Sequence, residues 1–292
     1  LSMGMYVAAR TKKIRIGTAV SVLTFHNPIF VAEETALLDT LSGGRLDFGI
    51  GRGQVVYEYG NFGVDYDSRT KKFNEILDVI IGLWTQSGFS YQGEFYQVDD
   101  LTVAPSPVQQ PHPPLYMAVS KTPASIDAAV ERNIPILTSP STPDSDTLEI
   151  VHSYYERCAA AGKAPMVEQM PFFRMVYLSD DQEQAVEDPR HAMTWVHDLN
   201  GLRRSLTGGS EIYMDLDQWR SNRTEQPPSY ESLLESTAYF GTPDRIVKKI
   251  ERLRDDHGIQ YFGASMSFGS MEHSKVMRSM ELFAKEVMPH FR

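Results

Sequence analysis

The sequence predicts an α/β fold built on a parallel sheet, because strand-like and helix-like segments alternate along nearly the whole chain. The expected strands are almost continuously apolar, which is typical of parallel strands covered on both faces. A chain of 292 residues could form two average domains or one barrel of β/α units. About six strands are expected, and the chain opens inside a helix. We therefore expect a (β/α)8 TIM barrel without its first one or two β/α units, rather than an open doubly wound sheet.

The first half of the chain alternates clearly. Residues 14–23 are β-branched or small, as in a strand, and Asn27-Pro28 supplies a cap and a first-turn proline for the helix that follows. Ser42-Gly43-Gly44 ends that helix. The expected elements are a helix end at 1–13, strands at 14–23, 45–50 and 114–120, a helix over 29–41, and a helix that carries Phe73, Ile76, Leu77, Ile80 and Trp84.

The second half continues the alternation up to a polar segment. Residues 200–236 are interrupted by glycine and proline, so they are interpreted as an insertion or a mobile lid, with a disordered excursion as the alternative. We expect one domain over residues 1–292. The expected strands are 134–139, 171–179 and 259–268, and the expected helices are 123–132, 144–161, 181–199, 243–256 and 273–287.

Composition favours a small-molecule partner. The formal net charge is −10, and we find no concentrated basic face of the kind that nucleic acid or an anionic membrane requires. No run of some 18 apolar residues predicts a membrane span. One cysteine, Cys158, excludes a disulfide framework within the chain and fits a cytoplasmic protein. No pair of histidines or carboxylates has the spacing of metal ligands, so no metal site is expected.

A glycine-flanked arginine follows the strand at 45–50. A positive charge between Gly51 and Gly53 could bring both the guanidinium of Arg52 and the backbone close to an anionic ligand. The alternative is a surface arginine in a glycine turn. The residues that follow, 57–59 (Tyr-Glu-Tyr), could contact a ligand or form an exposed aromatic and acidic loop.

Five motifs in order give the sequence its resemblance to a known family. They are TKKIRIGTAVSVL, HNPIFVAEETALLDTLSGGRLDFGIGRG, NFG at 61–63, PPLYMAVS, and GTPDRIVKKIERL together with MELFAKEVMPHFR. In this order they resemble the bacterial luciferase-like flavin-dependent monooxygenases, over all of the chain except 200–236. The resemblance implies a (β/α)8 barrel, reduced FMN (the deazaflavin F420 in some branches), and activation of O2 at the flavin C4a to oxidise a small organic substrate.

The resemblance also implies site residues. Arg52 matches the family arginine that pairs with the FMN phosphate. Ser120 and Thr122 match a second part of the phosphate site, although Thr122 could instead simply cap the helix that begins at Pro123, and Val119 stands where luciferase has a glutamate. Ala19-Val20 matches a non-proline cis peptide that lies against the flavin ring, the alternative being an ordinary strand end.

The family pattern places a catalytic histidine in an N-terminal segment that has no counterpart here, so the sequence assigns no catalytic acid or base. The resemblance further implies a separate flavin reductase and a homodimer formed through helix 29–41. The alternatives are an F420-dependent oxidoreductase and a non-catalytic flavin-binding protein.

Overall fold

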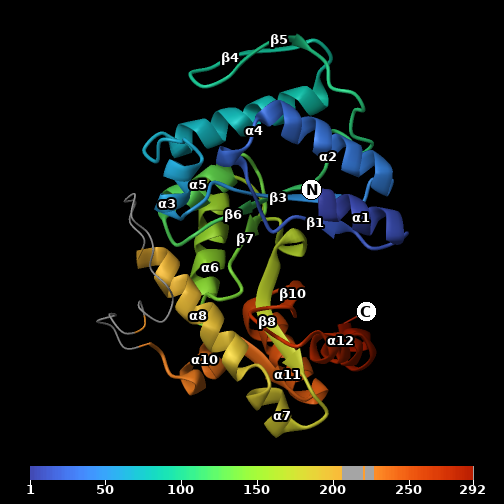
Figure 1. Cartoon of the computed structure of the whole chain (residues 1–292), viewed down its shortest axis with the longest axis vertical. Coiled ribbons are helices and arrows are strands. Elements are labelled where there is room, and N and C mark those ends of the chain that lie inside the picture. Colours follow the sequence, from blue (N-terminus) through green and yellow to red (C-terminus); the bar gives the residue numbers. More distant parts are fainter. Residues whose placement is uncertain (206–219, 221–226, 292) are drawn as a thin grey trace. The chain divides into compact units, whose positions relative to one another are not determined.

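A computed structural model describes residues 1–205, 220 and 227–291. These residues divide into two compact units, one formed by residues 1–118 and the other by the residues from Val119 onward (Figure 1). The single domain over 1–292 stays a prediction.

The first unit is organised around β3, which pairs in parallel with β1 and β2 on one edge and with β6 on the other. Figure 1 shows α2 and α4 lying side by side next to these strands, and the Trp84 indole N–H donates to the Ala32 carbonyl at 3.1 Å to join the two helices. The elements are α1 (Ser2–Arg10), β1 (Ile16–Gly17), β2 (Ser21–Val22), η1 (Leu23–Phe25), α2 (Pro28–Ser42), β3 (Leu46–Gly51), α3 (Val56–Asn61), α4 (Arg69–Thr85), β4 (Phe89–Gln92), β5 (Gln97–Leu101) and β6 (Leu115–Ala118).

The strand expected over 14–23 is two short strands instead. Ile16 pairs with Leu46 and Ser21 pairs with Ile50, so the first segment advances five residues while β3 advances four. The extra residue has no partner in a regular ladder of hydrogen bonds with β3, so the strand is interrupted between β1 and β2. Helix α3 and the hairpin of β4 and β5 were not predicted from the sequence, because these segments are short and lie in stretches interpreted as loops.

The second unit is organised around β8, which pairs in parallel with β10 and β9. One face of this sheet carries a buried apolar cluster that includes Met175 and Tyr177 of β8 and side chains of α8 and α10. Figure 1 shows α11 and α12 beside the same strands. The elements are α5 (Pro123–Glu131), β7 (Ile136–Leu137), α6 (Asp144–Ala160), η2 (Val167–Gln169), β8 (Pro171–Leu178), α7 (Gln182–Glu187), α8 (Arg190–Ser205), α10 (Tyr230–Ser236), β9 (Ala238–Gly241), α11 (Pro243–His257), β10 (Tyr261–Ser265), α12 (His273–Leu282), η3 (Phe283–Val287) and η4 (Met288–Phe291).

The helix expected over 181–199 is divided and longer than expected. Pro189 separates α7 from α8, since proline has no backbone N–H to donate to a helix, and α8 then continues to Ser205. The insertion predicted at 200–236 therefore begins inside a helix and ends with another, α10. Residues 206–219 and 221–226 of that insertion lie outside the described residues, and its role as a lid stays a prediction.

One buried carboxylate joins α2 to the segment that leads into β6. Asp39 is fully buried, and its Oδ2 accepts hydrogen bonds from the backbone N–H groups of Val108 at 2.8 Å and Gln109 at 2.9 Å. Its Oδ1 accepts from the Gln109 side-chain amide at 2.7 Å. Every polar group in this contact is therefore paired.

We predict that Asp39→Ala lowers the free energy of unfolding by about 2–4 kcal/mol, because it removes a buried acceptor from three partly buried N–H donors. Urea unfolding followed by circular dichroism measures this change. Glu33→Ala, an exposed position on the same helix, is the matched control and should change stability by less than about 0.5 kcal/mol. Equal effects of the two substitutions would contradict the assigned role of Asp39.

Candidate functional site

The glycine-flanked arginine lies at the carboxyl end of the central strand of the first unit. Gly51 is the last residue of β3, and Arg52 opens the loop between β3 and α3. A Cβ atom on Gly51 would lie 2.7 Å from Cγ2 of Val20. Gly53 has a φ of +90°, and a Cβ there would lie 2.9 Å from Val22. Side chains at either glycine would push this loop away from the end of β2, so both glycines are required for the position of Arg52.

The backbone of Arg52 is fixed by two hydroxyl groups. Its carbonyl accepts hydrogen bonds from Thr24 Oγ1 at 2.7 Å and from the Tyr59 hydroxyl at 2.5 Å. Tyr59 is buried, packs edge-on against Phe25 and Tyr66, and burial raises the pKa of its hydroxyl. Tyr59 is thus a buried support for the loop, so the exposed-loop alternative is wrong for this residue, and its contact with a ligand stays a prediction.

The guanidinium of Arg52 is only partly satisfied. Nη1 donates to Thr70 Oγ1 at 2.7 Å, near the start of α4. Nε is buried and has no hydrogen-bond partner among the described residues. A buried N–H without an acceptor is rare in folded proteins, and it identifies a position where a ligand oxygen would be favourable. A fixed cation with a spare donor suits an anionic group such as a phosphate.

The segment that contains Ala19 and Val20 lies beside this arginine. The peptide bond between the two residues is cis, as the resemblance implies. The close approach of Val20 to Gly51 places the segment next to the residue that precedes Arg52. Three of the five predicted cofactor-binding residues are therefore neighbours in the first unit.

The other two predicted residues form a hydroxyl cluster in the second unit, where α5 begins. Ser120 Oγ and Thr122 Oγ1 are 3.0 Å apart, and Thr122 Oγ1 donates to Ser125 Oγ at 3.1 Å. Ser125 Oγ in turn donates to the Thr122 carbonyl at 2.8 Å. Thr122 is the N-cap residue, but its side chain makes no capping hydrogen bond, so the simple capping alternative is not realised. Thr122 is exposed and Ser120 half-buried, which leaves both hydroxyls accessible at a helix N-terminus, where anions bind favourably.

The residues that support these side chains were not predicted from the sequence. Thr70 and Thr24 act on Arg52 from a helix start and a short 3-10 turn, and Ser125 holds the hydroxyl cluster together. Each is a common polar residue with no sequence signal of its own. Only the fold brings it to the site.

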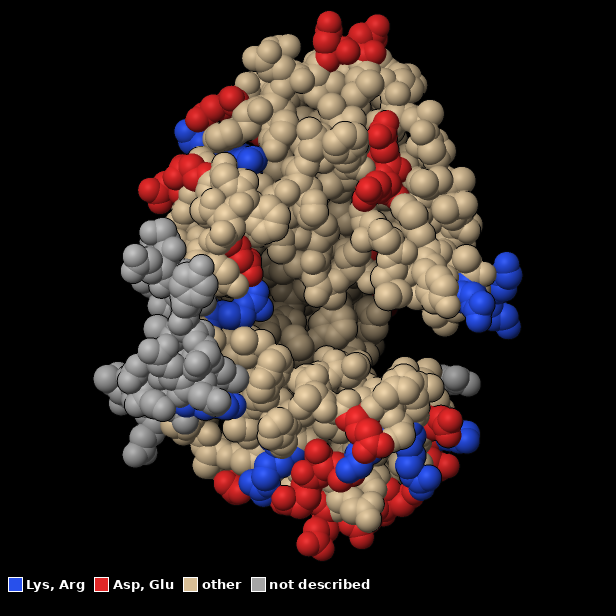
Figure 2. Space-filling view, in the orientation of Figure 1, with Lys and Arg blue, Asp and Glu red and all other residues tan. Residues whose placement is uncertain are grey.

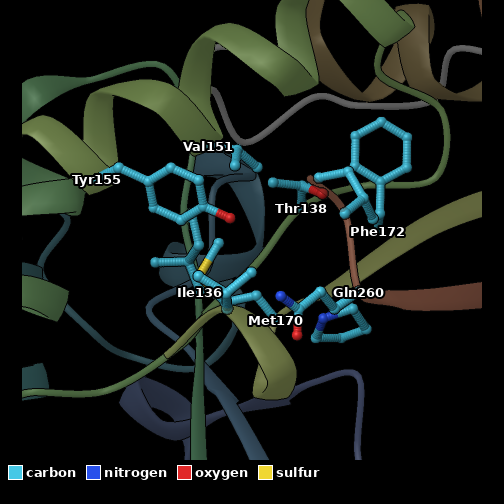
Figure 3. A pocket seen from close by; sticks show the side chains of 10 residues that line it. Ile136, Thr138, Val151, Tyr155, Met170, Phe172 and Gln260 are labelled. Carbon is cyan, nitrogen blue, oxygen red and sulfur yellow. The ribbon is translucent and has the colours of Figure 1, made fainter. Parts of the chain in front are cut away.

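The second unit also contains a small, partly open cavity of about 10 Å³. It is lined by residues that include Ile136, Thr138, Tyr155, Met170 and Phe172, and it has room for about one water molecule (Figure 3). Figure 2 shows many basic side chains next to acidic ones on the face in view, with one basic group standing apart at the right edge. No cluster of three or more potential metal ligands, and no helix able to cross a bilayer, occurs among the described residues.

Comparison with known sequences identifies relatives of the chain. The oxygenase component of flavin-dependent trigonelline monooxygenase from Acinetobacter baylyi is 33% identical over 61% of this chain. The match spans about half (50%) of that relative's length. The FMNH2-dependent dimethylsulfone monooxygenase from Pseudomonas putida is 24% identical over 97% of this chain and 76% of its own length.

The chain also matches solved structures over its whole length. Monooxygenase RslO1 from Streptomyces bottropensis matches with a TM-score of 0.83 and 26% identity, over 100% of this chain and 82% of its own. The oxygenating constituent of 3,6-diketocamphane monooxygenase from Pseudomonas putida, solved in complex with FMN, matches with a TM-score of 0.78 and 19% identity, over 100% and 83% of the two chains. The predicted fold class, an α/β barrel of the luciferase-like type, is confirmed. The family model for luciferase-like monooxygenases matches residues 1–260, and the chain belongs to this family.

Proposed function

We propose that the protein is a flavin-dependent monooxygenase that uses reduced FMN and O2 to oxidise a small organic substrate. The observation that carries this proposal is the glycine-flanked Arg52, whose guanidinium is oriented by Thr70 and retains a buried Nε–H with no partner in the part of the chain that the structure describes. The relatives named as flavin-dependent and FMNH2-dependent monooxygenases support the same chemistry.

Each predicted residue has a proposed part in holding the cofactor. Arg52 binds the FMN phosphate, because a guanidinium offers charge-assisted N–H donors to phosphate oxygens. The hydroxyls of Ser120 and Thr122 donate to phosphate oxygens, with the N-terminal amides of α5 adding favourable partial charge. Ala19 and Val20 lie against the flavin ring. Reduced FMN supplies the electrons and the O2-activating centre of the reaction. No described residue is assigned as its acid or base.

The proposed partners follow from the relatives. One of them is named an oxygenase component, which supports a separate reductase as the source of reduced flavin. We propose the cytoplasm as the location, where reduced nucleotide for such a reductase is available.

The central test supplies the purified protein with reduced FMN and O2, and in parallel with reduced F420 under anaerobic conditions. Candidate substrates are trigonelline and dimethylsulfone, the compounds named for the two relatives, together with other small organic molecules. We expect O2-dependent oxygenated product with FMN only. Hydride transfer from F420 would favour the oxidoreductase alternative. Tight FMN binding without turnover of any compound would favour a non-catalytic flavin protein.

The role of Arg52 makes a second prediction. Arg52→Ala should weaken FMN binding by about 1.5–3 kcal/mol, or roughly ten- to hundred-fold, since a charge-assisted hydrogen bond is lost. Riboflavin, which has no phosphate, should bind the variant and the parent protein similarly. Fluorescence titration measures both. Lys71→Ala is the matched control, because that exposed cation on the same helix as Thr70 pairs with Glu94, and it should change neither affinity. Equal losses for FMN and riboflavin would rule out a phosphate contact.

A third prediction concerns the proposed homodimer. Phe30, Leu37 and Leu41 are exposed on one face of α2, and Phe30 is 67% exposed. Exposed apolar side chains on one helix face are typical of an interface between subunits. We expect a dimer by light scattering at micromolar concentration and a monomer for Leu41→Glu, with Glu33→Lys as the control that stays dimeric. A monomeric parent protein would contradict the proposal.

A further inference from the structure

A second arginine, in the second unit, is fully buried and has no part in the proposed phosphate site. Arg174 lies in β8, and its Nε donates to Asp144 Oδ1 at 2.5 Å. Nη1 donates to the Phe173 carbonyl at 2.6 Å, and the guanidinium lies 3.9 Å from the centre of the Phe172 ring. Nη2 is buried without a partner among the described residues. Burial lowers the pKa of Arg174, and the charge of Asp144 opposes this effect.

The partner of Arg174 opens a long helix. Asp144 is the first residue of α6, where a negative charge is favourable, and its Oδ2 accepts from the Tyr239 hydroxyl at 3.0 Å. Tyr239 belongs to β9 and is buried. This network therefore ties the N-terminus of α6 to two strands of the β8 sheet.

The loop that ends at Asp144 carries several hydroxyl groups. Residues 138–143 leave the carboxyl end of β7, and in an α/β barrel the loops at this end of the strands form the active site. Ser139 is exposed and its Oγ lies 2.8 Å from Ser141 Oγ, which also accepts from the Asn200 amide at 3.4 Å. Thr138 Oγ1 is buried without a partner among the described residues. Figure 3 shows Thr138 beside Phe172, the ring that Arg174 covers.

We propose that Arg174 is a positioning residue for flavin binding. Through Asp144 it holds the N-terminus of α6, and with it the loop 138–143, so that the hydroxyls of Ser139 and Ser141 are placed to bond polar groups of the flavin. This inference rests on the proposed function. In this proposal the loop between β7 and α6 contributes to flavin affinity. That contribution requires Arg174, although Arg174 does not itself touch the flavin.

The competing explanation is a purely structural ion pair. Breaking a buried pair destabilises a protein as a whole, so loss of stability alone does not separate the two. The chain offers a matched control on the same helix. Arg157, near the other end of α6, forms an ion pair with Asp127 of α5 and is only partly buried. Removing the Arg174–Asp144 pair affects the N-terminal end of α6, and removing the Arg157–Asp127 pair affects its C-terminal end.

The test compares Arg174→Lys, Arg174→Met and Arg157→Met in the full chain. Amide hydrogen exchange is measured over residues 139–147 and 152–158, and FMN affinity is measured by titration at a temperature where circular dichroism shows each variant folded. For Arg174→Met we expect exchange over 139–147 to rise about tenfold, exchange over 152–158 to stay within about twofold, and the FMN Kd to rise about fivefold or more. Arg174→Lys keeps the charge without the planar fork, so its effects should be intermediate. Arg157→Met should leave exchange over 139–147 and the FMN Kd within about twofold.

Two results would overturn the proposal. One is Arg174→Met with parental exchange over 139–147 or parental FMN affinity. The other is exchange that rises equally throughout the second unit, which indicates a structural role alone. If Arg174→Met does not fold, the same criteria apply to Arg174→Lys. If the parent protein does not bind FMN, both the proposed function and the flavin part of this inference are wrong. The hydrogen-exchange data still test whether Arg174 holds the loop.

Discussion

The carbonyl group of Arg52 accepts two hydrogen bonds, from Thr24 and from buried Tyr59, and the candidate site of the first unit depends on them. They hold the loop after β3 close to β2, which is possible only because Gly51 and Gly53 leave room for Val20 and Val22. With the backbone fixed, one bond to Thr70 is enough to orient the guanidinium. The side chain is thereby held ready for an anion before any ligand binds, which reduces the ordering that binding must impose.

Each unit presents polar donor groups near the start of a helix, but the groups differ in kind. In the first, a cation has a buried donor left over, and in the second, the hydroxyls of Ser120, Thr122 and Ser125 satisfy one another at the start of α5. Hydroxyls can rotate to donate to a ligand, whereas the Arg52 Nε–H has a fixed direction. In the proposed roles, Arg52 supplies a charge and a donor of fixed direction, and the hydroxyl cluster supplies donors that can rotate.

The sequence predicted the regular parts of the fold well. The capping of α2 by Asn27 and Pro28, its end at Gly43, and the start of α11 at Pro243 depend on local chemistry that neighbouring residues specify. The break between β1 and β2 depends instead on register with β3, and the short strand β9 depends on pairing with β8. Both are long-range constraints without a local signal. Arg52 could be singled out because its glycines are adjacent in sequence. Thr70 and the Arg174 network could not, because their partners come from distant segments.

The most direct test of this account observes the Arg52 Nε–H group by NMR, with the resonance assigned by its disappearance in Arg52→Lys. We predict that FMN moves the Nε–H proton resonance downfield and slows its exchange with water, as expected when a buried donor gains a phosphate acceptor, and that riboflavin leaves it nearly unchanged. The same response to both ligands, or no response to saturating FMN, would contradict the phosphate-binding role of Arg52.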